Sequence, residues 1–139
     1  MRVLAVDYGD TRTGIAISDP TGFLAGETTV ITAYRPDVAA QGVAELAKSR
    51  RVDRIVVGRP LNMNGTFGER AQKCEDFAVL LRELTGLEVA LWDERLTSVD
   101  ANRILSDAGK KRSKQRERVD AVAASLILEG YLGFLKRNG

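Results

Sequence analysis

Residues 2–18 read RVLAVDYGDTRTGIAIS, and this stretch carries the clearest fold signal in the chain. It contains two short apolar segments rich in strand-forming residues, at 2–6 and 13–18, with turn-forming residues between them. These segments predict a β-hairpin. The first strand ends where Asp7 begins the turn.

The rest of the chain combines further apolar runs with segments of helical period. Three more strands are expected, at residues 26–31, 54–58 and 87–92. Helices are expected over 36–49, 68–85, 97–105 and about 119–136, and the polar segments 59–65 and 106–118 are interpreted as loops. This order predicts an α/β fold in which helices flank a five-stranded mixed sheet. The length fits a single domain over residues 1–139.

The composition restricts the chemistry that the chain can perform. It contains no histidine and a single cysteine, Cys74. Histidine-based catalysis, zinc sites that need histidine and intrachain disulfide bonds are therefore excluded. A lone cysteine favours a reducing compartment, so a cytoplasmic location is expected. No apolar run is long enough to span a membrane, and no membrane partner is expected.

Acidic residues stand where strands are predicted to end, which is where open α/β sheets bind ligands. Asp7 ends the first strand, Asp93 and Glu94 follow the last one, and Asp120 begins the last helix. Three or four converging carboxylates would form a site suited to two Mg²⁺ or Mn²⁺ ions, which activate water and stabilise a leaving oxygen. Each acid taken alone could equally belong to a turn, a solvated strand end or a first helical turn.

Positive charge is concentrated just before Asp120 in the sequence. Residues 110–118 contain six Lys or Arg residues against one Glu, whereas the whole chain has a net charge of +2. No aromatic residue lies among these charges, so contacts with phosphate groups are expected rather than base stacking. A solvated charged loop is the alternative interpretation. The residues assigned to nucleic-acid binding here are Lys110, Lys111, Arg112, Lys114 and Arg116.

Four motifs, in order along the chain, resemble the YqgF/RuvX family. They are Asp7-Tyr8-Gly9 with Arg12 and Gly14-Ile15-Ala16, then Gly58-x-Pro60-Leu61-Asn62-Met63-x-Gly65, then Asp93-Glu94-Arg95-Leu96-Thr97-Ser98, then Val119-Asp120-x-x-Ala123-Ala124. Members of that family have a ribonuclease H-like fold and are described as pre-16S ribosomal RNA nucleases or as similar to Holliday junction resolvases. The resemblance implies that Asp7, Glu94 and Asp120 bind the metal ions and are the catalytic acids.

Arg12, Arg59 and Asn62 complete the predicted nucleic-acid-binding residues. Arg12 belongs to the first motif, and Arg59 and Asn62 belong to the segment that follows the fourth predicted strand. That segment should lie beside Asp7 and Glu94, where its side chains could contact phosphate or sugar. A plain connection between a strand and a helix is the alternative interpretation.

The leading hypothesis is a metal-dependent nuclease that hydrolyses phosphodiester bonds at the 5′ end of pre-16S ribosomal RNA. One alternative is a Holliday junction resolvase acting on branched DNA, and another is a non-catalytic RNA-binding module associated with the ribosome. An actin-like ATPase is less favoured, because such enzymes clamp nucleotide between two domains. The expected partners are structured RNA or branched DNA and also the ribosome, with the protein a monomer or a weak homodimer.

Overall fold

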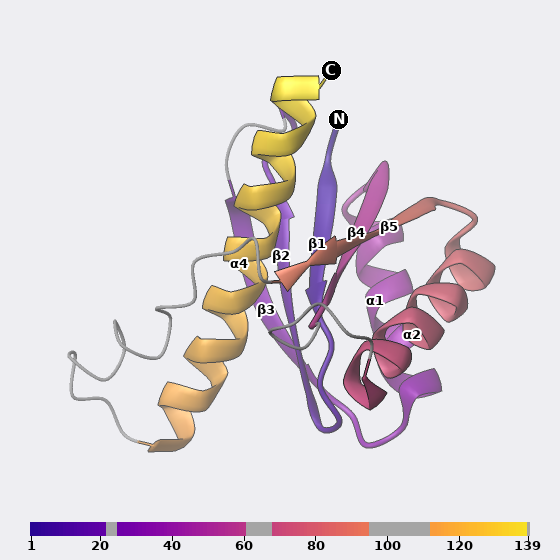
Figure 1. The fold of residues 1–139 in the computed structure, drawn as a ribbon, viewed down its shortest axis with the longest axis vertical. Helices are drawn as coiled ribbons and strands as arrows, with labels where there is room; N and C mark the ends of the chain where they lie inside the picture. Colours follow the sequence, from indigo (N-terminus) through magenta and orange to yellow (C-terminus); the bar gives the residue numbers. More distant parts are fainter. Residues whose placement is uncertain (22–24, 61–67, 95–111, 139) are drawn as a thin grey trace.

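The computed structural model describes residues 1–21, 25–60, 68–94 and 112–138, with the backbone alone at 25, 112–120 and 138 (Figure 1). Its strands are β1 (Val3–Asp7), β2 (Arg12–Ser18), β3 (Ala25–Thr32), β4 (Arg54–Arg59) and β5 (Glu88–Asp93). Its helices are α1 (Pro36–Ser49), α2 (Glu69–Thr85) and α4 (Arg112–Asn138). The predicted α/β class and the five predicted strands are confirmed.

The five strands form one mixed sheet in the order β3-β2-β1-β4-β5. β1 pairs antiparallel with β2, and β2 pairs antiparallel with β3. β4 pairs parallel with β1 on one side and with β5 on the other. The carboxyl ends of β1, β4 and β5 therefore meet at one edge of the sheet, which we call the carboxyl edge.

The helices form a layer on each side of the sheet (Figure 1). α1 and α2 cover one face, over a core that includes Leu4, Val6, Ile15 and Phe77. α4 covers the opposite face, where a second core contains Val3, Ala5, Val56, Trp92 and Ile127. Successive residues of a strand point to opposite faces, so β1 supplies alternate side chains to the two cores. Among the described segments, no helix is long and apolar enough to cross a membrane.

The predicted helix ends of α1 and α2 agree with the structure. Pro36 occupies the first position of α1, where its missing N–H costs no helical hydrogen bond. α2 ends at Gly86, which has a φ of 69° and whose N–H donates to the carbonyl of Arg82. This is the left-handed cap that glycine adopts without steric penalty.

The start of the last helix was predicted wrongly. α4 begins at Arg112 rather than near Val119, so residues 112–118 form its first turns and are not a loop. Lys, Arg, Gln and Glu favour helix through their intrinsic propensity, but they form no apolar stripe that periodicity could detect. The helix predicted over 97–105, together with Lys110 and Lys111, lies outside the described residues.

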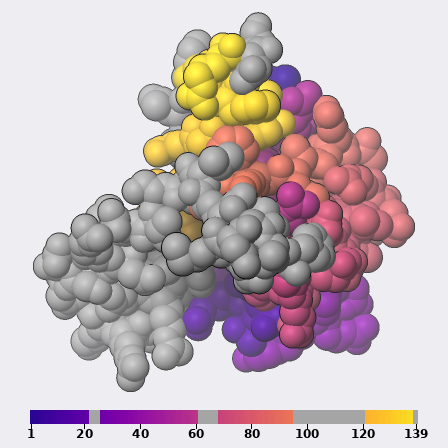
Figure 2. Space-filling model, viewed as in Figure 1, coloured from indigo at the N-terminus to yellow at the C-terminus, as the bar shows by residue number. Residues whose placement is uncertain are grey.

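α4 lies mainly over β2 and β1, and side chains of its C-terminal half contact β5, beside which they appear at the surface (Figure 2). The ring of Trp92 lies 6.0 Å from the ring of Tyr131 and 6.0 Å from the ring of Phe134, both on α4. A Cβ atom at Gly130 would lie only 3.0 Å from Cζ2 of Trp92. A Cβ atom at Gly133 would lie 3.5 Å from the nearest atom, in the flexible side chain of Arg137. Gly130 therefore leaves room for the Trp92 ring against α4.

These two glycines make a matched pair for a stability test. Replacing glycine by alanine inside a helix usually stabilises it by about 0.5–1 kcal/mol. We expect Gly133→Ala to raise the free energy of unfolding by about that amount, and Gly130→Ala to gain less because Trp92 must shift. Urea denaturation of both variants measures the difference. An equal gain from both would contradict the packing described here.

Candidate active site

Two acids from distant parts of the chain meet at the carboxyl edge. Asp7 ends β1, and Glu94 directly follows β5. Ala5 and Trp92 face α4, so the two-residue period of a strand places Asp7 and Glu94 on the α4 side as well. The two side chains share a hydrogen bond. The predicted convergence of these acids is therefore seen in the structure.

Gly58 makes this convergence possible, because its strand β4 lies between the strands of the two acids. A Cβ atom at Gly58 would lie 3.0 Å from Cγ and 3.1 Å from Cδ of Glu94, and 2.5 Å from Cδ1 of Ile127. The Glu94 side chain thus lies over the β4 backbone, in space that any larger residue would occupy, and Ile127 of α4 closes in beside it. Here glycine serves close approach rather than a turn.

Burial raises the pKa of the Glu94 carboxyl above its usual range. The hydrogen bond with Asp7 and the charge of Arg70 lower that pKa, and the charge of Asp93 raises it. Two carboxyl groups can share a hydrogen bond only if one of them holds a proton. When both are ionised, their repulsion favours a bound cation. The pair is therefore a place where a proton and a positive ion compete.

Cys74 lies close to the acids but is not suited to act as a nucleophile. Burial raises the pKa of its thiol to about 12, and the charges of Glu94 and Asp7 add to that effect while Arg70 opposes it. The side chain is 2% exposed. Because the reactive form of cysteine is the thiolate, this residue has a packing role.

Arg70 and Lys73 of α2 bring positive charge to the same edge, and neither was predicted. Nη2 of Arg70 donates to the carbonyl of Tyr8, and its Nη1 lies 3.3 Å from Oδ1 of Asp10. Nζ of Lys73 lies 3.3 Å from the same oxygen. The sequence did contain a signal for them. Residues three apart lie on the same face of a helix, and this helix begins just after the polar segment 59–65, which was expected to lie beside the acids.

The predicted phosphate contacts Arg12 and Arg59 also lie at this edge. Arg59 ends β4, and its Nη1 forms an ion pair with Oε1 of Glu75 at 3.3 Å. Arg12 begins β2, which runs antiparallel to β1 and so starts where β1 ends. The edge therefore combines the acid pair with arginines from β2, β4 and α2.

Asp120 lies within α4, but its side chain is outside the described part of the chain, as are those of Arg112, Lys114 and Arg116. Its position is four residues before Ala124 and seven before Ile127, and both of these are buried against the sheet. Asn62 lies outside the described residues. Among the side chains that are described, no group of three or more potential metal ligands occurs.

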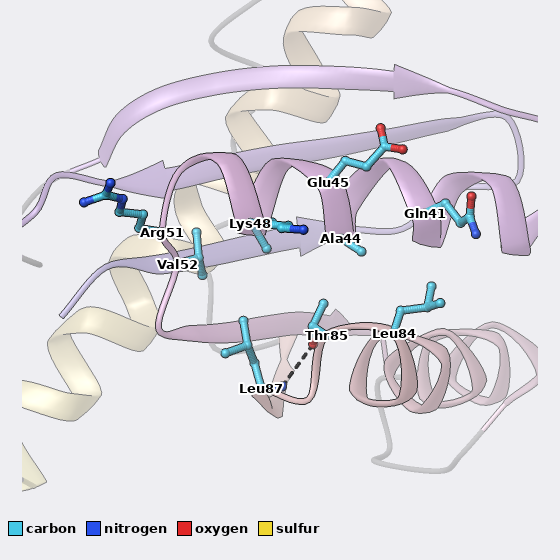
Figure 3. A pocket seen from close by; sticks show the side chains of 10 residues that line it. Gln41, Ala44, Glu45, Lys48, Arg51, Val52, Leu84, Thr85 and Leu87 are labelled. Carbon is cyan, nitrogen blue, oxygen red and sulfur yellow. Dashed lines mark hydrogen bonds between the residues drawn. The ribbon is translucent and has the colours of Figure 1, made fainter.

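A pocket of about 480 Å³ lies elsewhere, between α1 and α2 (Figure 3). It is lined by Val52, which precedes β4, and by Leu87, which precedes β5. Leu87 N–H donates to the Thr85 hydroxyl at 3.1 Å within its wall. Both strands begin here and end at the carboxyl edge, so this pocket lies at the opposite end of the sheet from Asp7 and Glu94.

The fold resembles those of two solved resolvases. RuvC from T. thermophilus, in complex with a Holliday junction substrate, matches with a TM-score of 0.63 and 14% identity over 96% of both chains. The fowlpox virus resolvase, in complex with Holliday junction DNA, matches with a TM-score of 0.61 and 13% identity, over 97% of this chain and 99% of that one. These matches confirm the predicted ribonuclease H-like fold.

Sequence relatives match over nearly the whole chain. A protein from Bacillus cytotoxicus named "Putative pre-16S rRNA nuclease" is 48% identical over 134 residues, which is 95% of this chain and 98% of that protein. A protein of the same name from Clostridium botulinum is 43% identical over 137 residues, which is 99% of this chain and 100% of that protein. Residues 1–133 match the family model described as RuvX, Holliday junction resolvase. The chain therefore belongs to the RuvX family.

Proposed function

We propose that this protein is a single-domain, cytoplasmic nuclease that hydrolyses phosphodiester bonds at the 5′ end of pre-16S ribosomal RNA with the help of divalent metal ions. The observation that carries the proposal is the contact between Asp7 and Glu94 over Gly58. The names of the relatives support ribosomal RNA precursor as the substrate.

The residues at the acid pair fit a divalent metal ion. Carboxylate oxygens are the ligands that Mg²⁺ and Mn²⁺ prefer, and the two carboxyl groups stand at the carboxyl ends of two different strands of one sheet. Asp7 and Glu94 would hold the metal together with Asp120, whose position is on the stripe of α4 that faces the sheet. Two such ions would activate water and stabilise the leaving oxygen of the phosphodiester.

The other residues of the edge would attract and orient the substrate. Positive charge beside the acids comes from Arg12, Arg59, Arg70 and Lys73. The last three also pair with Glu75 or Asp10, and the positive charge of all four would attract a polyanion towards the acidic site. Arg116 precedes Asp120 by about 6 Å along the helix axis, so the basic first turns of α4 continue this charge away from the acids. We assign the phosphate contacts of residues 112–116 to these turns, and we keep Lys110 and Lys111, which lie outside the described residues, in the same proposed set.

Branched DNA is the second candidate substrate. It is favoured by the likeness in fold to two resolvases that were solved with Holliday junctions. Symmetric resolution of a four-way junction requires two active sites and therefore a dimer, whereas trimming an RNA end requires one.

The substrate and the role of Asp7 can be tested together. We expect the purified protein in Mn²⁺ to cleave a pre-16S RNA fragment near the mature 5′ end. Asp7→Asn should lower the rate by more than about 100-fold, because even the outer partners of metal ligands are worth 10–100-fold. Asp37→Asn, in the exposed first turn of α1, is the matched control and should not lower it. Retained activity in Asp7→Asn would refute the site, and cleavage of a four-way junction alone would favour the second substrate.

Metal binding can be measured without catalysis. A ligand that binds only the folded state stabilises it, by about 2.7 kcal/mol at 100 times its Kd. We expect Mn²⁺ to raise the Tm of the wild-type protein, and to raise that of Asp7→Asn and Glu94→Gln much less. Glu129→Gln, on the exposed side of α4, should respond as the wild type does. The same shift in all four proteins would rule out the acid pair as the metal site.

The raised pKa of Glu94 predicts a pH dependence in the metal-free protein. The folded state binds the Glu94 proton more tightly than the unfolded state, whose carboxyl has a pKa near 4.5, so this group lowers stability as the pH rises above 4.5. Glu94→Gln cannot ionise. In a chelating buffer the free energy of unfolding of Glu94→Gln, relative to that of the wild type, should increase as the pH rises above 4.5. Urea denaturation across this range checks the trend, and a shrinking difference would oppose it.

A further inference from the structure

A second hollow lies at the carboxyl edge, on the α1 and α2 side of the sheet. Its volume is about 380 Å³, within the range of roughly 300–1,000 Å³ that ligand sites occupy. The lining includes Tyr8, Tyr34, Phe77 and Leu80 as ring and apolar groups, with Lys73 and Asp76 as charged groups. We call it the Tyr34 pocket.

The Tyr34 pocket and the acid pair lie on opposite sides of the backbone at the point where β1 ends. Tyr8 directly follows Asp7, and consecutive Cα atoms are about 3.8 Å apart. Asp7 points to the α4 side, whereas Tyr8 belongs to the core on the α1 and α2 side. A strand of nucleic acid that crosses the carboxyl edge would therefore pass from the acids directly to the pocket.

Tyr34 is unusually exposed for an aromatic residue. Its side chain is 80% exposed, and its ring contacts no other aromatic ring in the described part of the chain. The pocket floor is rigid by contrast, because the rings of Tyr8 and Phe77 are buried and stack with centroids 4.2 Å apart. An exposed aromatic ring above an apolar floor is the arrangement on which proteins stack unpaired bases.

The charged groups of the pocket are held in place by neighbours. Oδ1 of Asp76 accepts a hydrogen bond from Nε2 of Gln72 at 2.9 Å, and no described residue donates to Oδ2. A carboxylate oxygen accepts hydrogen bonds from the exocyclic amino groups of bases, as it does from the N4 amine of cytosine. Lys73 is paired with Asp10 on the rim towards the acids.

We propose that the Tyr34 pocket binds an unpaired base of the nucleotide next to the cleaved bond, with Tyr34 stacking on the base and Asp76 accepting from its amino group. This inference rests on the proposed nuclease function, since the acid pair defines which bond is cleaved. It implies that the substrate has a single-stranded segment beside the cleaved bond and that Tyr34 helps to determine which substrates are bound.

Binding measured without divalent metal tests the pocket independently of cleavage. The probes are an RNA duplex with a single-stranded overhang that carries 2-aminopurine, whose fluorescence is quenched by stacking, and the same duplex with blunt ends. Tyr34→Ala should weaken binding of the overhang RNA about tenfold and remove the quenching that the protein adds. It should leave binding of the blunt duplex unchanged. Tyr34→Phe should behave as the wild type, because stacking needs the ring and not the hydroxyl.

Two further variants sharpen the result. Val79→Ala removes an exposed apolar side chain of α2 that does not line the pocket, and it should have no effect. Overhangs of cytidine should bind more tightly than overhangs of uridine, which lack the amino group, and Asp76→Asn should reduce that difference. Urea denaturation verifies that each variant is folded.

The proposal is overturned if Tyr34→Ala binds the overhang RNA as the wild type does, or if it loses affinity equally for both RNAs. Cleavage in Mn²⁺ is measured separately with the same preparations. Quenching that depends on Tyr34 in a protein that cleaves nothing would refute the nuclease and keep the base pocket. Cleavage that requires Asp7, with binding indifferent to Tyr34, would do the reverse.

Discussion

The parallel pairing of β4 with both β1 and β5 is the constraint on which the rest of the structure depends. A tight turn cannot join two parallel strands, so the connections from β3 to β4 and from β4 to β5 must each pass over one face of the sheet. Such crossovers are almost always right-handed. The connections therefore place α1 and α2 on the same face. The opposite face is left for α4, which covers it with the second core. The same pairing brings three strand ends together at the carboxyl edge, where the acids lie.

When both of its carboxyl groups are ionised, the acid pair is electrostatically unfavourable, and favourable packing holds the two groups together. β1 and β5 are fixed by their ladders with β4, and Ile127 closes over Gly58, so Asp7 and Glu94 cannot move apart without disturbing a buried core. Burial of Glu94 disfavours its charged form, and Arg70 relieves only part of that cost. A site in which packing opposes charge repulsion is prepared to bind cations, which is how this arrangement serves the proposed chemistry.

The alternation of a β-strand divides the carboxyl edge between two roles. Asp7 faces α4 and the acid pair, and Tyr8 faces α2 and the Tyr34 pocket. Arg70 joins the two sides, since it binds the Tyr8 carbonyl, pairs with Asp10 and lowers the pKa of Glu94. A substrate strand lying along this edge would contact chemistry on one face of the sheet and a base-binding surface on the other.

Local sequence patterns were enough to predict the strands and helices that have one apolar face, including the hairpin of β1 and β2. They also predicted the end of α2 at Gly86. They failed at Arg112, where helical propensity without an apolar stripe leaves no periodic signal. The motifs identified Asp7 and Glu94 as candidate metal-binding acids, but the contact between their side chains depends on β4 lying between β1 and β5 and on the space that Gly58 leaves. Only the tertiary structure placed Arg70 and Tyr34 at the same edge, because strand order and packing distance join segments whose local sequences carry no record of one another.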